Sequence, residues 1–289
     1  MLANRLCVIG LGLIGGSLLR ALRAADAVQT VVGYDPDPRQ GQDALELGVV
    51  DIVAADAASA VRNADLVVVA VPVLRTAEAF AAIASSLAPG CVVTDVGSTK
   101  QSVLRDVVSV FGELPPWYVP GHPIAGTEKS GVANSIEHLF RGHRVILTPH
   151  AQQSADALAR VRSMWELCGA RVFEMDAARH DRIFAASSHL PHMLAYSFVD
   201  MLANLDGSEE VFSNAGGGLR GFTRIASSSP QMWHDIVRAN APAVGELLAR
   251  QIGELQIMQT LLEQQRWDEL KTIFERARHA REHYLTQIE

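Results

Sequence analysis

The chain has 289 residues, of which 48% are hydrophobic, and a formal net charge of −7. This is enough apolar material for one large or two ordinary domains, and the scattered charges give no sign of a nucleic-acid surface. Cys7, Cys91 and Cys168 stand far apart in apolar segments, so we expect reduced core residues of a cytoplasmic protein and not a disulfide framework. The apolar stretch 6–19 is too short and too glycine-rich to span a bilayer, so we expect a soluble protein with no membrane partner.

The first apolar run, RLCVIG, breaks into three glycines and continues as a helical pattern. Gly10 allows a tight turn, Gly12 lets the backbone approach a pyrophosphate, and Gly15 lets the helix pack closely on the strand. The N–H groups at the start of that helix, which includes Leu13 and Ile14, then hold the phosphates. The segment therefore predicts a dinucleotide-binding turn.

Asp35 ends the second apolar run, TVVGYD, twenty residues after Gly15. A carboxylate in this place accepts hydrogen bonds from both ribose hydroxyls and repels a 2′-phosphate, so NAD is favoured over NADP. Arg39 follows closely and could cover the adenine or, less favourably, bind a phosphate.

Short β-like runs alternate with helical ones up to about residue 176, as a parallel doubly wound sheet requires. The predicted strands are 6–10, 30–34, 66–71, 91–95, 118–120, 145–148 and 171–174. The predicted helices among them are 14–24, 40–47, 76–86, 100–111 and 155–167. This part is predicted to be an α/β Rossmann-type domain that binds the cofactor, residues 1–176.

After residue 176 strand patterns nearly vanish, which predicts an all-α domain for residues 177–289. Helical patterns cover 181–205, 231–239, 243–262 and 267–288, with a glycine-rich loop at 216–221. Long helices with an apolar face and no partner sheet most often bury that face against a second subunit. We therefore expect a homodimer formed through the helical domain, with self-contained helical packing as the alternative.

Four distinctive loops, 10–15, 70–72, 95–100 and 121–128, each follow a predicted strand. Ligands of an open parallel sheet lie beyond the carboxyl ends of its strands, so these loops should converge on one site. Val71 and Pro72 either leave room for the cofactor or simply stop the strand. Ser98 could reach both nicotinamide and substrate, or cap the helix that starts near Lys100.

His122 stands between Gly121 and Pro123 in GHPIAG. When an alcohol carbon loses a hydride, its hydroxyl proton must leave as well, and a neutral histidine with an ordinary pKa of about 6.5 suits that transfer. A histidine in a turn is more often structural. These neighbours, however, leave the imidazole uncrowded at a strand end, so we predict that His122 is the catalytic base.

Two later segments carry groups suited to an anionic ligand. His189 and His192 in SSHLPHML share a helix face. We favour contact with an anion or substrate and no metal site, since no Cys, Asp or Glu stands at ligand spacing, and packing of one of the two stays open. Arg220 and Arg224 follow a triple glycine. A guanidinium holds a carboxylate bidentately, and we favour Arg224 because the residues after it suggest a packed setting.

Together these segments resemble the prephenate/arogenate dehydrogenase family of tyrosine biosynthesis, also called cyclohexadienyl dehydrogenases. The resemblance rests on VIGLGLIGGSL, DVGSTK, GHPIAGTEKSG, SHLPH and TRIASSSPQMW, which occur in that order over nearly the whole chain. It implies a Rossmann NAD domain and a helical dimerisation domain. It also implies oxidative decarboxylation of prephenate to 4-hydroxyphenylpyruvate with NAD, and arogenate as a second substrate.

The resemblance implies roles for single residues. His122 would take the hydroxyl proton, with Ser98 helping to place it and the nicotinamide. Arg224 would bind a substrate carboxylate, with further contacts from His192 near the ring and from His189. The other matched pocket positions are Thr127, Glu128, Trp233 and Gly217.

One of these positions leaves alternatives open. Glu128 could pair with the ammonium group of arogenate, with Lys129, or with a neighbouring subunit, so prephenate stands as the substrate and arogenate as a possible second one. Gly217 matches a loop that approaches the site of a neighbouring subunit.

Two other functions compete with this interpretation. A β-hydroxyacid dehydrogenase shares the Rossmann-plus-helices plan but depends on a lysine in the first long helix of its second domain, and the predicted helix 181–205 contains none. A non-catalytic NAD-binding sensor would use the helical domain to contact a partner, and His122 and Arg224 would then be dispensable.

Overall fold

The computed structural model describes residues 1–285, and the chain divides into two units, Met1–Ala241 and Pro242–Glu289. No helix among the described residues is both long enough and apolar enough to cross a membrane. The three cysteines are buried and unpaired. The domain boundary at residue 176 stays a prediction.

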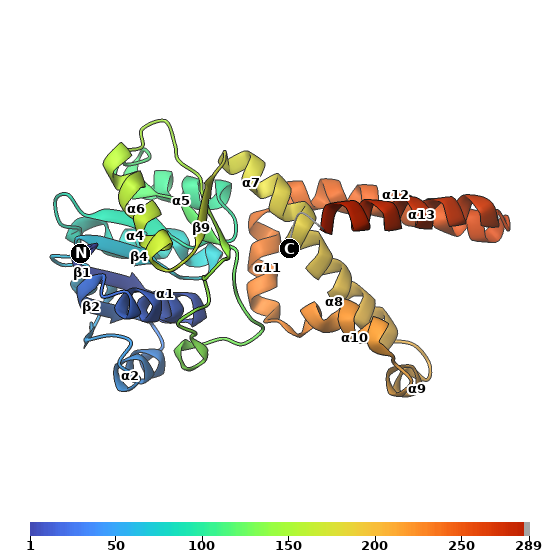
Figure 1. Cartoon of the computed structure of the whole chain (residues 1–289), viewed down its shortest axis with the longest axis horizontal. Coiled ribbons are helices and arrows are strands. Elements are labelled where there is room, and N and C mark those ends of the chain that lie inside the picture. The colour runs from blue at the N-terminus through green and yellow to red at the C-terminus, as the bar shows by residue number, and fades with distance from the viewer. Residues whose placement is uncertain (286–289) are drawn as a thin grey trace. The chain divides into compact units, whose positions relative to one another are not determined.

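The first unit contains a parallel sheet, of which β2, β1 and β4 are labelled in Figure 1. Its strand order is β3-β2-β1-β4-β5-β6. Its strands are β1 Ala3–Ile9, β2 Val28–Tyr34, β3 Ile52–Val53, β4 Leu66–Val69, β5 Val92–Asp95 and β6 Tyr118–Val119. The short edge strand β3 was not predicted, because two residues give no periodic pattern. This order reverses between β1 and β4, and ligands of doubly wound folds bind at that reversal.

Helices cover both faces of this sheet because its strands are apolar on both sides, as in β4, whose four residues are all buried. The helices of this region are α1 Leu13–Ala24, α2 Pro38–Glu46, α3 Ala57–Ala60, α4 Thr76–Ile83, α5 Gln101–Phe111 and α6 Ala155–Leu167. One core cluster packs Val8 and Val68 against α1 and α6. A second packs Cys7 and Val67 against α3, α4 and α5.

A second, three-stranded sheet holds β7 Gly121–Pro123, β8 Arg144–Leu147 and β9 Arg171–Glu174. The expectation that 145–148 and 171–174 continue the main parallel sheet was wrong. Strand β8 pairs antiparallel with β7, opposite His122, and parallel with β9. Apolar periodicity predicts a strand but does not select its partner.

The chain from residue 177 to 239 is helical, as predicted, but it is more broken than the sequence suggested. Its helices are α7 Ala177–Phe184, α8 Leu190–Ala203, α9 Ser208–Ser213, α10 Gly217–Thr223 and α11 Pro230–Ala239. The predicted helix 181–205 is interrupted by a π-helical turn, Ala185–His189. Pro191 lacks the N–H that would continue the α-helical pattern, which accounts for a widened turn just before it.

The predicted glycine-rich loop 216–221 is helix α10, so that prediction was wrong. Phe222 of α10 packs edge-on against Phe198 of α8, with ring centroids 5.4 Å apart. Glycine lowers helix propensity by about 1 kcal/mol, which tertiary packing readily offsets.

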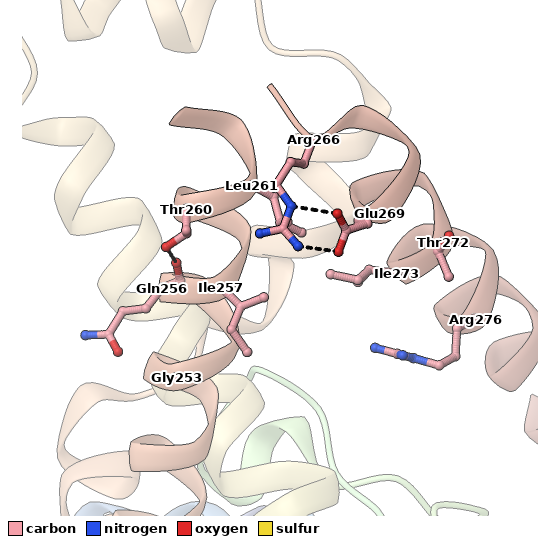
Figure 2. A pocket seen from close by; sticks show the side chains of 10 residues that line it. All are labelled: Gly253, Gln256, Ile257, Thr260, Leu261, Arg266, Glu269, Thr272, Ile273 and Arg276. Atoms are coloured by element: carbon pink, nitrogen blue, oxygen red, sulfur yellow. Dashed lines mark hydrogen bonds and ion pairs between the residues drawn. The ribbon is translucent and has the colours of Figure 1, made fainter. Parts of the chain in front are cut away.

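The second unit is formed almost entirely by two helices, α12 Ala241–Glu263 and α13 Trp267–Leu285. The predicted helices 243–262 and 267–288 agree with them as far as the structure describes the chain, and residues 286–288 lie outside the described part. Residues of both helices line a cavity of about 600 Å³, with Ile257 and Ile273 facing across it and an Arg266–Glu269 ion pair at one side (Figure 2).

Candidate active site

The glycine turn after β1 has the three properties that the sequence predicts. Gly10 has φ +101°, and a Cβ there would overlap the carbonyl oxygen of Ala70 at the end of β4. A Cβ at Gly15 would overlap the carbonyl oxygen of Gly10, so strand, turn and helix pack as closely as backbone allows. At Gly12 a Cβ would meet no described atom within 4 Å. The open side of Gly12 and the α1 N-terminus at Leu13 suit an approaching pyrophosphate.

Asp35 links this turn to the end of β2. Its carboxylate accepts from the N–H groups of Leu11 at 2.8 Å and Asp37 at 2.9 Å. Each carboxylate oxygen keeps a second acceptor position, so two ribose hydroxyls can still bind. Arg39 instead pairs with Asp37 on the surface, so this structure gives no support for its predicted contact with adenine.

The segment after β4 joins the sheet to the helical part of the same unit. Val71 is half-buried, Pro72 is exposed, and Val73 is buried against Trp233 and Ile236 of α11. Val71–Pro72 therefore ends a strand at the place where α11 packs. Its predicted contact with a cofactor remains a prediction.

A buried ion pair holds the loops after β5 and β6. Lys100, completely buried, donates from Nζ to Asp95 and to the carbonyl oxygen of Gly121. Asp95 also accepts from Tyr118 Oη at 2.8 Å and from the backbone N–H of Gly97 at 2.7 Å. Burial lowers the pKa of Lys100, and the Asp95 carboxylate opposes that shift. The network sets the position of β7, which carries His122.

His122 lies on β7 and not in an open turn, and only 9% of it is exposed. Its ring packs edge-on against those of His180 and Phe184, with centroids 5.0 and 4.9 Å away. The expectation of an uncrowded imidazole was therefore wrong, because α7 packs over this strand. Burial holds its pKa well below the ordinary value, with contributions from His180, Lys100 and His189. The histidine is neutral at pH 7, as a base must be.

One ring nitrogen of His122 is bonded and one is free. Nδ1 lies 2.8 Å from His180 Nε2, whereas Nε2 makes no hydrogen bond within residues 1–285. The imidazole thus keeps one position for a hydroxyl group despite its burial.

The first turn of α5 is capped from a distant part of the chain. Asp181 accepts from the backbone N–H groups of Lys100 at 2.8 Å and Gln101 at 2.9 Å. The alternative that Ser98 caps this helix was therefore wrong. Ser98 is half-buried, and its hydroxyl makes no hydrogen bond to any described residue.

His189 and His192 lie in one region but differ in environment. His189 is buried, and its Nδ1 accepts from Asn240 Nδ2 at 3.1 Å. His192 donates from Nδ1 to the carbonyl oxygen of Ser188 at 2.8 Å and stacks on Trp233, with ring centroids 3.5 Å apart. The indole N–H of Trp233 is buried and has no partner among the described residues. The structure thus brings His192 and Trp233 together.

Arg224 begins a 3₁₀ turn, Arg224–Ser227, and is exposed, so the expected packed setting was wrong for its side chain. Ile225 and Ala226, which follow it, are half-buried. Burial lowers the pKa of His192, and the Arg224 charge lowers it further, so the two side chains share a neighbourhood.

The remaining predicted pocket residues are exposed. Thr127 and Glu128 lie in the loop after β7, where Thr127 Oγ1 accepts from the N–H of Lys129 at 3.2 Å. No ion pair joins Glu128 to Lys129 in the described part of the chain. Gly217 is the first residue of α10, with open space on its Cα. No hydrogen bond or ion pair joins any of these three described residues to His122, and their roles stay predictions.

The chain matches the models of two protein-domain families. Residues 18–174 match the nucleotide-binding domain of prephenate dehydrogenase, and residues 176–276 match the prephenate dehydrogenase dimerization domain. This chain belongs to the prephenate dehydrogenase family.

Individual relatives cover nearly all of the chain. It is 37% identical to a cyclohexadienyl dehydrogenase of Zymomonas mobilis, over 96% of this chain and 95% of that protein. It is 35% identical to a prephenate dehydrogenase of Bacillus subtilis, over 96% of this chain and 76% of that protein. The structure of Aquifex aeolicus prephenate dehydrogenase with hydroxyphenyl propionate and NAD⁺ superposes with a TM-score of 0.89 at 32% identity, covering 99% of this chain and 98% of that one.

Sequence reasoning missed several buried polar residues of this prephenate dehydrogenase family member. His180 and Asp181 bond to each other, to His122 and to α5, and Asn240 bonds to His189 and to the carbonyl oxygen of Asp181. An adjacent His–Asp pair at the start of an otherwise amphipathic helix was the available signal. Its burial against α5 depends on tertiary structure.

The buried His189 gives a prediction about acid stability. Burial lowers its pKa to about 4, so between that value and its ordinary value of about 6.5 the unfolded chain binds more protons than the folded one. His189 therefore contributes stability above about pH 6.5, and this is lost as the pH falls toward 4. Between about pH 7.5 and about pH 5, the titration of His189 should lower the free energy of unfolding by about 2 kcal/mol.

Urea unfolding at both pH values measures this contribution. In His189→Asn the new carbonyl can still accept from Asn240, but the titrating ring is gone. The acid-induced loss should then be smaller by about 2 kcal/mol than in the wild type. An equal loss in both proteins would show that His189 titrates normally in the folded state.

Proposed function

We propose that this chain is an NAD-dependent dehydrogenase that oxidatively decarboxylates prephenate to 4-hydroxyphenylpyruvate and also accepts arogenate. The main support is His122, a buried neutral imidazole with a free Nε2. It follows the carboxyl edge of a Rossmann sheet whose glycine turn suits a dinucleotide. Family membership supplies the class of reaction.

The residues present fit NAD. The turn at Gly10–Gly15 and the N-terminus of α1, with Leu13 and Ile14, would hold the pyrophosphate. Asp35 would accept from the ribose hydroxyls and disfavour a 2′-phosphate, and Val71, Pro72 and Ser98 would border the nicotinamide. Bound there, NAD supplies the hydride acceptor.

In this proposal His122 Nε2 accepts the proton of the ring hydroxyl, while the ring carbon that carries this hydroxyl gives up a hydride. The C–CO₂⁻ bond then breaks, its electron pair enters the ring, and carbon dioxide leaves. The resulting phenolate oxygen takes a proton back from His122, which gives the hydroxyl group of 4-hydroxyphenylpyruvate. Because the ring becomes aromatic, the protein has mainly to orient the substrate and remove one proton. Ser98 would help to place His122 and the nicotinamide.

The substrate carboxylate would bind Arg224, with the ring near the stacked His192–Trp233 pair and His189 offering its Nε2–H. Thr127, Glu128 and Gly217 would complete the pocket once ligand is bound. Supporting this are the shared neighbourhood of Arg224 and His192 and the unpartnered indole N–H of Trp233.

Arg224→Ala should raise the substrate KM with little change in kcat. A hydrogen bond to a charged group contributes about 1.5–3 kcal/mol, so the rise should be about 10- to 150-fold. Steady-state kinetics at saturating NAD measure it, and Arg220→Ala is the matched control, since that exposed arginine lies one helix turn away. A purely lowered kcat would move Arg224 from binding to the reaction step, and equal rises in both variants would indicate general attraction by positive charge.

The function is tested by incubating the purified chain with prephenate or arogenate and with NAD or NADP. We expect NADH absorbance to rise together with 4-hydroxyphenylpyruvate when prephenate and NAD are present. Turnover of neither cyclohexadiene, with intact NAD binding, would overturn the proposal in favour of a sensor.

We also propose that the protein works as a homodimer in the cytoplasm. Residues 176–276 match a dimerization domain, and the second unit exposes large apolar side chains. These are Ile252, Leu255, Ile257, Leu262, Trp267 and Phe274. Three buried unpaired cysteines suit a reducing compartment. Light scattering after size exclusion should give twice the mass of one chain, and a monomer at micromolar concentration would contradict the dimer.

A further inference from the structure

Two side chains, His180 and Asp181, form a continuous chain of hydrogen bonds with the proposed base. Asp181 Oδ1 lies 2.8 Å from His180 Nδ1, and His180 Nε2 lies 2.8 Å from His122 Nδ1. All three residues are buried. Asp181 and His180 belong to α7, whereas His122 belongs to β7, so the base is contacted by a segment nearly sixty residues further along the chain.

The hydrogen-bond donors can be assigned from the Asp181 end. Burial raises the pKa of this carboxyl group, but hydrogen bonds from His180 and from the N–H groups of Lys100 and Gln101 more than offset burial and leave it lowered. Asp181 is thus ionised at pH 7 and can only accept. His180 must therefore carry a proton on Nδ1.

The assignment then passes to the next ring. Burial lowers the pKa of His180, although Asp181 opposes the shift, so this imidazole is neutral and its Nε2 has a lone pair. His122 Nδ1 must then be the donor across the 2.8 Å contact, because two lone pairs facing each other would repel. The lone pair of His122 is left on Nε2, the nitrogen with no protein partner.

We infer that His180 and Asp181 are positioning residues that hold His122 in the one neutral tautomer whose Nε2 can accept a proton. This inference rests on the proposed role of His122 as base. The other tautomer would carry its proton on Nε2 and could not accept the substrate's proton at that nitrogen.

The same arrangement stabilises the charge that the reaction creates. The O–H bond of the substrate breaks and an N–H bond forms on Nε2, so His122 becomes an imidazolium. Its Nδ1–H donates to His180, whose Nδ1–H donates to the Asp181 carboxylate, and this negative charge offsets the new positive one. Among the other groups that face the two rings, Lys100 and His189 oppose the charge, whereas Asp95 acts on His180 in the same sense as Asp181.

A pair of substitutions at His180 separates positioning from packing. His180→Phe keeps a flat ring packed against both His122 and Phe184 but removes the acceptor, so kcat should fall about 10- to 100-fold with the substrate KM nearly unchanged. His180→Gln offers a carbonyl oxygen to His122 Nδ1 and should recover most of that loss. His143→Phe and His143→Gln, at an exposed histidine on the surface, are the matched controls and should behave as wild type. Equal impairment of the two His180 variants, or wild-type kcat in His180→Phe, would overturn the inference.

The tautomer itself can be observed without any variant at His180. In protein labelled with ¹⁵N-histidine, two-bond ¹H–¹⁵N spectra distinguish protonated from unprotonated ring nitrogens, and the signals missing from His122→Asn identify the ring. We expect a protonated Nδ1 and an unprotonated Nε2 for His122 at pH 7. The reverse pattern would overturn the inference even if His180→Phe fails to fold.

The spectra test the positioning role and the turnover assay tests the proposed function, so each can be refuted without the other. An inverted tautomer in a chain that oxidises prephenate would refute the positioning role and leave the proposed function standing. The expected tautomer in a chain that turns over neither cyclohexadiene would refute the proposed function and remove the catalytic meaning of the tautomer.

Discussion

His122→Asn should lower kcat by about 10²- to 10⁴-fold, the contribution expected of a positioned general base. Asparagine can still donate to His180 from its side chain, so β7 and its neighbours should remain in place. The glycine turn and Asp35 are untouched, and NAD affinity should be nearly unchanged. Steady-state turnover and a fluorescence titration with NAD measure the two quantities, with His143→Asn as the surface control. A kcat equal to that of the wild type would remove His122 from the mechanism.

The pH dependence of wild-type activity provides a second test of the role of His122. kcat/KM reports the pKa of groups in the free enzyme, and burial holds the pKa of His122 well below its ordinary value. The neutral base therefore persists as the pH falls through about 6.5, and the acid limb should begin below that value. The limb should be absent from the residual activity of His122→Asn, and an unchanged limb would assign it to another group.

Lys100→Met should destabilise the fold by about 3–5 kcal/mol, because removing one partner of a buried ion pair leaves the other charge uncompensated. Both side chains of the Lys100–Asp95 pair are almost completely buried. Methionine has a similar length but cannot donate to Asp95 or to the carbonyl oxygen of Gly121. The free energy of unfolding from urea titration measures the effect.

Lys271→Met is the matched control for this substitution. Lys271 pairs with Glu275 at 3.6 Å on the surface of α13, where both side chains are mostly exposed, and such pairs contribute about 0–1 kcal/mol. A loss at Lys100 no larger than that at Lys271 would show that Asp95 is satisfied by Tyr118 and the backbone alone. The expected loss would also be accompanied by a lower kcat, because Gly121 precedes His122.

The features that the sequence predicted best are those decided within a few residues. The conformation of Gly10 and the close packing at Gly15 follow from a strand, a turn and a helix in direct succession. The order of helices and strands follows from apolar periodicity, which is also a property of short stretches of sequence. The composition change near residue 176 likewise predicted a helical C-terminal part, which α7 to α13 form.

What the sequence did not predict depends on contacts between distant segments. The partner of β8 is β7 and not a strand of the main sheet, which no local pattern specifies. The burial of His122 and the capping of α5 by Asp181 both arise because α7 packs against β7 and the start of α5. Arg224 was expected in a packed setting because its neighbours are apolar, yet its own side chain is exposed.

Because Asp181 caps α5, the residues before position 176 depend on the helices that follow it. A polypeptide ending at residue 176 would retain the turn at Gly10, Asp35 and His122 itself. It would leave two N–H groups of α5 without their carboxylate, and an imidazole free to exchange its proton between both nitrogens. Recognition of the nucleotide could therefore survive such a truncation, whereas proton abstraction needs the helices that follow.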